Sequence, residues 1–150
     1  MARFVHICGI RQFEESVRND LLQVMRMPLY TAITEDGFVS DEKKVKIAKE
    51  ITRIHTAIMK VPENFVRVVF LSYPKGSGYA AGKAATTAAL NCVLRSGHTG
   101  EDKTEMLKQL WSMFQDLTGI PTDQLAISIQ EIPSSNAMEM GQIMQAVGHK

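Results

Sequence analysis

An internal repeat constrains the fold of this chain more than any other feature of its sequence. Residues 40–74 align with residues 99–133 without a gap, at an offset of 59 positions. Identical residues recur at Glu42 and Glu101, Lys44 and Lys103, Lys49 and Lys108, Pro62 and Pro121, and Pro74 and Pro133. Apolar residues recur at matching positions as well, so we expect the two stretches to fold into the same supersecondary unit.

Each copy of the repeat begins with a predicted helix. Ser40 and Thr99 are suited to cap the N-terminus of a helix, and acidic residues follow each of them. After each cap, apolar residues recur with the i, i+4, i+7, i+11 spacing of a helix that buries one face. This pattern predicts helices over residues 41–59 and 100–118.

Each predicted helix is followed by a proline and then by a β-branched strand. Pro62 and Pro121 end the helices, because proline cannot continue a helix and restricts the residue before it. Another strand precedes each helix, so every copy is a β-α-β unit whose crossover helix makes its two strands parallel. The four strands are predicted over residues 28–33, 66–73, 86–94 and 125–132.

Two β-α-β units predict an α/β (α+β) fold, in which a four-stranded sheet carries two long helices on one face. The other face then needs a cover, because its apolar residues are too numerous to lie in water. A chain of this size cannot supply a third layer, so we expect a homo-oligomer that packs through its sheet faces. The residues assigned to the bare face are Val66, Val68, Phe70, Leu125, Ile127 and Ile129.

The repeat also divides the chain into an N-terminal extension, residues 1–27, and one domain, residues 28–150. The extension has two interpretations: a translation start assigned too early, or an appended helix over residues 12–26. Its arginines suggest a targeting peptide, but its acidic residues and the lack of an apolar segment disfavour one. The domain comprises repeat one (28–74), a Gly-rich loop (75–85), repeat two (86–133) and a C-terminal segment (134–150).

Composition disfavours several classes of protein. Seventeen basic and sixteen acidic residues give a net charge of +1, which argues against binding to nucleic acid or to a membrane surface. No apolar run reaches the ~18 residues that a transmembrane helix needs. Cys8 and Cys92 are too few for a disulfide framework and lack metal-ligand spacing. They fit a reducing, cytoplasmic location, and we expect no metal and no cofactor.

The dipeptide Met27-Pro28 opens the first predicted strand, and the chemistry of Pro28 depends on where the chain starts. If translation starts at Met27 and that methionine is removed, Pro28 carries a free secondary amine, which is a compact acid and base. If the chain starts at Met1, the Pro28 nitrogen belongs to an amide and cannot take up a proton near neutral pH.

With a start at Pro28, the chain resembles the tautomerase superfamily, whose members combine an N-terminal proline with duplicated β-α-β units. The length of about 120 residues points to the cis-3-chloroacrylic acid dehalogenase-like group. The resemblance runs to about Gly141, and it implies a homotrimer that acts on a small carboxylate. Its most specific local matches are ITRIH at 51–55, LRSGH at 94–98, EIP at 131–133 and EMG at 139–141.

The resemblance also implies a set of site residues. The group uses the terminal proline, a first-helix histidine, two arginines, a fourth-strand tyrosine and a late glutamate. The matching positions here hold Pro28, His55, Arg95, His98, Ser128 and Glu139. Pro28, His55, Arg95 and Glu139 match in type and are the expected catalytic residues, while Arg95, His98 and Ser128 are expected to bind substrate. His98 replaces the second arginine, and Ser128 replaces the tyrosine.

Physical chemistry supports roles for the matching residues. A desolvated proline amine suits a general base, and a neighbouring carboxylate would favour its protonated, acidic form. Arg95 can grip a carboxylate through two hydrogen bonds and stabilise a developing enolate. His55 can donate a hydrogen bond from the margin of the buried helix face, where the second repeat has the apolar Phe114.

The two departures narrow the expected chemistry. His98 is mostly neutral at pH 7, and Ser128 is shorter and much less acidic than a tyrosine, so efficient dehalogenation is disfavoured. We therefore expect a proline-dependent tautomerase of small enol/keto or unsaturated acids, with at most weak hydratase or dehalogenase activity. The alternative is a non-catalytic oligomeric protein of the same fold, in which the N-terminal extension blocks the Pro28 amine.

Overall fold

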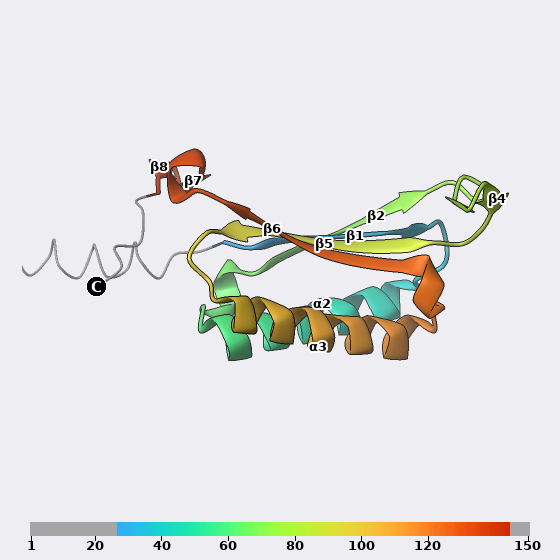
Figure 1. Cartoon of the computed structure of the whole chain (residues 1–150), viewed down its shortest axis with the longest axis horizontal. Helices are drawn as coiled ribbons and strands as arrows, with labels where there is room; N and C mark the ends of the chain where they lie inside the picture. Colours follow the sequence, from blue (N-terminus) through green and yellow to red (C-terminus); the bar gives the residue numbers. More distant parts are fainter. Residues whose placement is uncertain (1–26, 145–150) are drawn as a thin grey trace, which may run out of the picture.

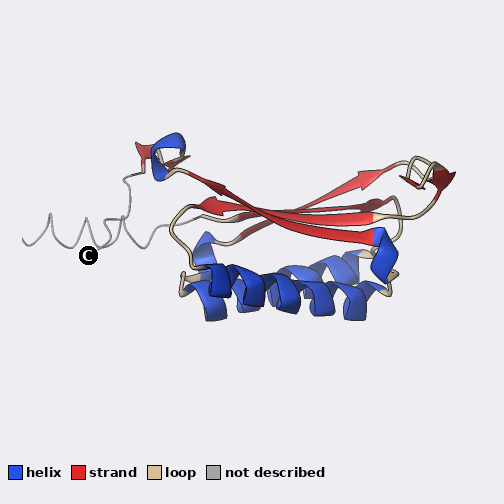
Figure 2. Cartoon of the chain, viewed as in Figure 1, coloured by secondary structure: helices blue, strands red, loops and turns tan. Residues whose placement is uncertain are grey.

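The computed structural model describes residues 27–144. These residues form two layers, a four-stranded sheet and a pair of long helices that both lie on one of its faces (Figures 1 and 2). The main elements are β1 (Leu29–Glu35), α2 (Asp41–Met59), β2 (Arg67–Tyr73), β5 (Ala88–Arg95), α3 (Gly100–Thr118) and β6 (Leu125–Ile132). The predicted fold is confirmed: both helices have the expected bounds, and the strand ends differ by at most two residues. The predicted helix over residues 12–26 and Cys8 lie outside the described residues.

The sheet has the order β2-β1-β5-β6. Strand β1 is parallel to β2, and β5 is parallel to β6, as each β-α-β unit requires. The two units meet where β1 runs antiparallel to β5. Each repeat therefore contributes one half of the sheet and one helix.

The helix ends follow from local chemistry in both repeats. The Ser40 and Thr99 hydroxyls accept hydrogen bonds from the backbone N–H groups of Lys43 and Asp102, which caps α2 and α3. At the other ends the chain turns through left-handed residues, Lys60 with φ 56° and Gly119 with φ 71°. Glycine adopts this conformation without steric cost, whereas a lysine that adopts it incurs a steric cost. None of the described helices is long and apolar enough to cross a membrane.

The hydrophobic core lies between the helices and the sheet. The helix residues at the i, i+4 and i+7 positions of the predicted spacing are buried in it, together with every second residue of the two central strands, whereas Ile58 and Leu117 at i+11 are half-buried. The core residues with no more than 1% exposure include Tyr30, Ala32, Ile47, Ile51, Ile54, Leu90, Cys92, Met106, Leu110 and Phe114.

The predicted assignment of residues to the bare face of the sheet is wrong. Val66, Val68, Phe70, Leu125, Ile127 and Ile129 all pack against the core beneath the helices. The opposite, open face instead exposes Leu29, Val69 and Leu71, which are 42%, 44% and 50% accessible. Strand β2 is apolar at consecutive positions, so alternation could not indicate which set of side chains faces the helices.

Two small hairpins extend beyond opposite ends of the sheet (Figure 1). Strands β3 (Tyr79–Ala80) and β4 (Lys83–Ala84) form one of them, within the segment 75–85 that was predicted as a loop. Strands β7 (Met138–Glu139) and β8 (Gln142–Ile143) form the other, in the C-terminal segment. The β7–β8 hairpin lies at the end of the sheet where β1 begins, so it can contribute to a site there.

Candidate active site

Four elements bring their ends together where β1 starts. Because β5 is antiparallel to β1, it ends at this edge, and α3 begins here after a short loop. Helix α2 returns from the far end of β1, so its last turns also lie here (Figure 1). The register pairs Leu29 with Val93, which places Pro28 and Met27 next to Leu94 and Arg95. Pro28 is fully buried, and its carbonyl accepts a hydrogen bond from the Arg67 N–H.

Glu139 links Arg95 to the peptide that precedes Pro28. One carboxylate oxygen, Oε1, lies 3.6 Å from Arg95 Nε. The other, Oε2, accepts a hydrogen bond from the Met27 backbone N–H at 3.1 Å. Arg95 is 3% exposed and Glu139 is 7% exposed, so this ion pair is largely screened from water. The structure therefore places Arg95 and Glu139 side by side, next to Met27, the residue that precedes Pro28.

His55 lies deeper than expected. It is 1% exposed and sits inside the buried face of α2, whereas the sequence placed it at the margin of that face. Its Nδ1 atom is 2.7 Å from the Tyr30 hydroxyl, and the two rings meet edge to face. Burial, and to a smaller extent the charge of nearby His98, lowers the pKa of the His55 imidazole to about 4. His55 is therefore uncharged at neutral pH.

His98 lies in the loop between β5 and α3, where it influences two neighbours. Its charge acts on His55, and its backbone hydrogen bond helps to lower the pKa of Glu131. The larger cause of that lowering is Lys103, whose Nζ donates to Glu131 Oε2 at 2.7 Å. The Lys103–Glu131 pair thus anchors the loop that carries His98 beside His55.

Ser128 is separate from this cluster within one chain. It lies in the middle of β6 on the open face, where it is exposed and donates a hydrogen bond to Asn91 Oδ1 at 2.8 Å. Asn91 is its register partner and precedes Arg95 by four residues. At about 3.3 Å per strand residue, this separation is roughly 13 Å along the sheet.

Tyr30 is a member of the cluster that the sequence-based reasoning missed. Its side chain is completely buried in β1, two residues after Pro28. A buried phenol requires a hydrogen-bond partner, so a tyrosine within a buried strand is a signal that could have found it. Burial raises the pKa of Tyr30, which keeps the hydroxyl protonated.

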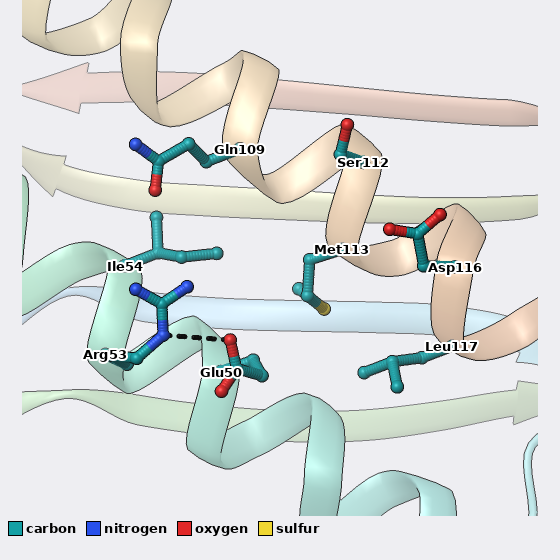
Figure 3. Close-up of a pocket in the computed structure, with 8 residues that line it drawn as sticks. All are labelled: Glu50, Arg53, Ile54, Gln109, Ser112, Met113, Asp116 and Leu117. Atoms are coloured by element: carbon teal, nitrogen blue, oxygen red, sulfur yellow. Dashed lines mark hydrogen bonds and ion pairs between the residues drawn. The ribbon is translucent and has the colours of Figure 1, made fainter.

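A groove of about 400 Å³ lies elsewhere, between α2 and α3. It opens on the side of the helices away from the sheet, and the Glu50–Arg53 ion pair of 2.9 Å lies at its rim (Figure 3). None of the predicted site residues lines it. The lining residues are Glu50, Arg53, Ile54, Gln109, Ser112, Met113, Asp116 and Leu117.

Comparison with known proteins finds relatives of the same fold. A family model described as "Putative oxalocrotonate tautomerase enzyme" matches residues 27–141. The solved structure of Ps01740 is 30% identical, with a TM-score of 0.72, and the match covers 74% of this chain and 99% of that one. The structure of N1, a member of the cis-3-chloroacrylic acid dehalogenase family, is 26% identical, with a TM-score of 0.71 and coverage of 79% and 84%. No curated protein matches.

The family model covers most of the chain, and it begins at Met27, directly before the proline that opens β1. The chain therefore belongs to the oxalocrotonate tautomerase family, within the tautomerase superfamily. The resemblance inferred from the sequence is confirmed. A fused 4-OT trimer structure, 18% identical with a TM-score of 0.71, shares the same fold.

Proposed function

We propose that this protein, in a form that begins at Pro28, is a tautomerase that interconverts the enol and keto forms of small carboxylic acids. The observation that carries the proposal is the Glu139 carboxylate, which joins Arg95 to the backbone nitrogen directly before Pro28. A proline amine at this position would lie beside the cation of Arg95 and the anion of Glu139. Family membership supports the same reading.

In the proposed reaction each site residue has a distinct role. The Pro28 amine accepts the proton of the enol hydroxyl while the C=O bond forms, and its conjugate acid returns a proton to carbon. Arg95 binds the substrate carboxylate and stabilises the negative charge that develops between the two proton transfers. Glu139 favours the protonated amine through its charge, and His55 donates a hydrogen bond to substrate oxygen. No cofactor is required for these steps.

Hydration and dehalogenation are less well supported. Both need a firmly polarised carboxylate and an activated water, and this chain has His98 and Ser128 in place of the arginine and tyrosine types that the resemblance implies. Ser128 lies on the open face, hydrogen-bonded to Asn91. We therefore propose that any hydratase or dehalogenase activity is weak compared with the tautomerase activity.

We further propose that the protein is a homotrimer that packs through its open sheet faces. Leu29, Val69 and Leu71 expose apolar surface there, and contiguous apolar surface is typical of an interface. Fused 4-OT structures of the same fold are described as trimers. The buried free thiol of Cys92 fits a cytoplasmic setting.

A second candidate function follows from the Met27 hydrogen bond to Glu139. In the full-length chain the Pro28 nitrogen is part of an amide, and the N–H of the preceding residue, Met27, donates a hydrogen bond to the Glu139 carboxylate. Such a chain would be a non-catalytic oligomeric protein of the same fold. The intact mass of the protein from its native source distinguishes the two forms, because the active form begins at Pro28.

The proposal predicts a difference in rate between two forms of the protein. A chain expressed from Met27 should lose that methionine and ketonise a simple enolpyruvate at least ~100-fold faster than the full chain, because only the free amine can transfer protons. Ultraviolet absorbance of the enol measures both rates.

Two variants of the shorter form serve as controls. Arg95→Ala should lose about 10²–10³ in kcat, like the removal of an oxyanion contact. Pro28→Ala retains a primary amine and should keep part of the activity. Equal rates for the full and shorter chains would disprove the role of the Pro28 amine.

A further inference from the structure

A buried polar contact beside the site connects Tyr30 with His55. The Tyr30 hydroxyl lies 2.7 Å from His55 Nδ1 and 3.2 Å from Met106 Sδ. Tyr30 and Met106 are 0% exposed and His55 is 1% exposed, so water does not compete for these atoms. The three side chains come from β1, α2 and α3, so the contact joins both repeats.

The hydroxyl has one proton and three neighbouring groups that can accept it: His55 Nδ1, Met106 Sδ and the sulfur of Cys92. An imidazole nitrogen is a much stronger acceptor than a thioether sulfur, which accepts only weakly. The distance of 2.7 Å to His55 is also the typical length of a strong O–H hydrogen bond, whereas the contact of 3.2 Å with Met106 Sδ is a weak hydrogen bond to sulfur. Both observations favour donation from Tyr30 to His55 Nδ1.

We infer that Tyr30 is a positioning residue that fixes the tautomer of His55: Nδ1 accepts the tyrosine proton, and Nε2 carries the imidazole proton. A neutral imidazole has one N–H, so occupation of Nδ1 as an acceptor makes Nε2 the donor. His55 then offers a hydrogen-bond donor without a positive charge, and it cannot adopt the tautomer that would present a lone pair at Nε2.

The second repeat provides an internal comparison. Phe114 occupies the position equivalent to His55, and it is 0% exposed in α3. A hydrocarbon ring thus fills the same place in the same supersecondary unit. Packing alone therefore does not require a histidine at position 55, and the polar pair is specific to the half of the molecule that carries Pro28.

The tautomer can be read directly by long-range ¹H–¹⁵N NMR of the full chain at pH 7. We expect His55 to show an unprotonated Nδ1 and a protonated Nε2. The His55→Gln spectrum identifies its signals among those of the four histidines. Tyr30→Phe should shift the signals towards a mixture of tautomers, whereas Met106→Leu, which removes only one weak sulfur acceptor, should leave them unchanged.

Two outcomes would overturn the inference: a protonated Nδ1 in the wild-type protein, or an unchanged tautomer in Tyr30→Phe. The wild-type spectrum alone is decisive for the hydrogen-bond direction, so the test stands even if a variant does not fold. This readout does not depend on catalysis, although the role of His55 towards substrate rests on the proposed function.

A kinetic measurement tests that role in whichever form of the chain is active. Tyr30→Phe should lower kcat about tenfold with little change in KM, and adding it to His55→Gln should cause no further loss. Additive losses would contradict action through His55. If neither form is active, the proposed function fails, while the NMR result still decides the tautomer.

Discussion

At the scale of single residues, His55 illustrates how burial determines chemistry. The side chain could carry a charge near neutral pH in the unfolded chain, where its ordinary pKa is 6.5. In the folded protein, desolvation makes the charged form unfavourable and the pKa falls to about 4. The folded state thus binds the proton more weakly than the unfolded state, and stability depends on pH.

The first prediction is a loss of stability in acid that depends on His55. Above pH 6.5 the imidazole is neutral in both states, so its full contribution is present, and it is lost as the pH falls from 6.5 towards 4. At pH 4.5 the loss should be about 2–3 kcal/mol relative to pH 7.5. Urea denaturation at fixed protein concentration measures it.

His55→Gln is the matched control for this pH dependence, because glutamine is polar but does not titrate. Its stability should fall less over the same pH interval. An identical pH dependence in the two proteins would show that other groups cause the loss.

At the scale of secondary-structure elements, the β3–β4 hairpin depends on a close contact with the end of β2. The Tyr73 hydroxyl donates to the Thr87 carbonyl at 2.7 Å and accepts from the Thr87 N–H at 2.9 Å. Gly78 lies against this contact. A Cβ atom there would be 2.7 Å from the Tyr73 hydroxyl oxygen and would also clash with the Ala85 carbonyl oxygen.

The second prediction is that Gly78→Ala destabilises the protein by about 1–3 kcal/mol, because backbone must move to accept the methyl group. Gly100→Ala is the control, since a Cβ at the start of α3 meets nothing within 4 Å. That change should be neutral or slightly stabilising. Thermal unfolding of both variants gives the comparison, and equal stabilities would contradict the close approach at Gly78.

At the scale of the whole molecule, the sheet has one covered face and one open face. The helices cover the side that carries Val68, while Val69, its neighbour in β2, faces the other way and is 44% exposed. Substitutions at these two adjacent valines can therefore distinguish the stability of the folded protomer from the stability of the proposed assembly.

The third prediction uses this pair of valines. Val68→Asp should destabilise the protomer by about 2–4 kcal/mol, because a charge next to the core is poorly solvated. Val69→Asp should preserve the fold but dissociate the oligomer. Circular dichroism and light scattering at micromolar concentration measure the two effects. A wild-type monomer, or an intact oligomer in Val69→Asp, would contradict packing through the open face.

The sequence was sufficient for the local elements and the family. Helices α2 and α3 have their predicted bounds because their caps, their periodic apolar residues and the prolines that follow are local signals. The repeat then fixed two β-α-β units, and the matched motifs indicated that Arg95 and Glu139 belong with Pro28. In the structure Arg95 pairs with Glu139, and Glu139 also contacts Met27, the residue before Pro28.

Tertiary structure decided what depends on contacts between distant segments. Val68 and Val69 are equally apolar, so only the docking of the helices determines which of them is covered. The contact between Tyr30 and His55 requires β1 and α2 to pack at one register, because neither residue indicates the other in the sequence. The sequence alone determined which elements form, since their signals span a few residues; the faces, the depth of His55 and its partner followed only from packing.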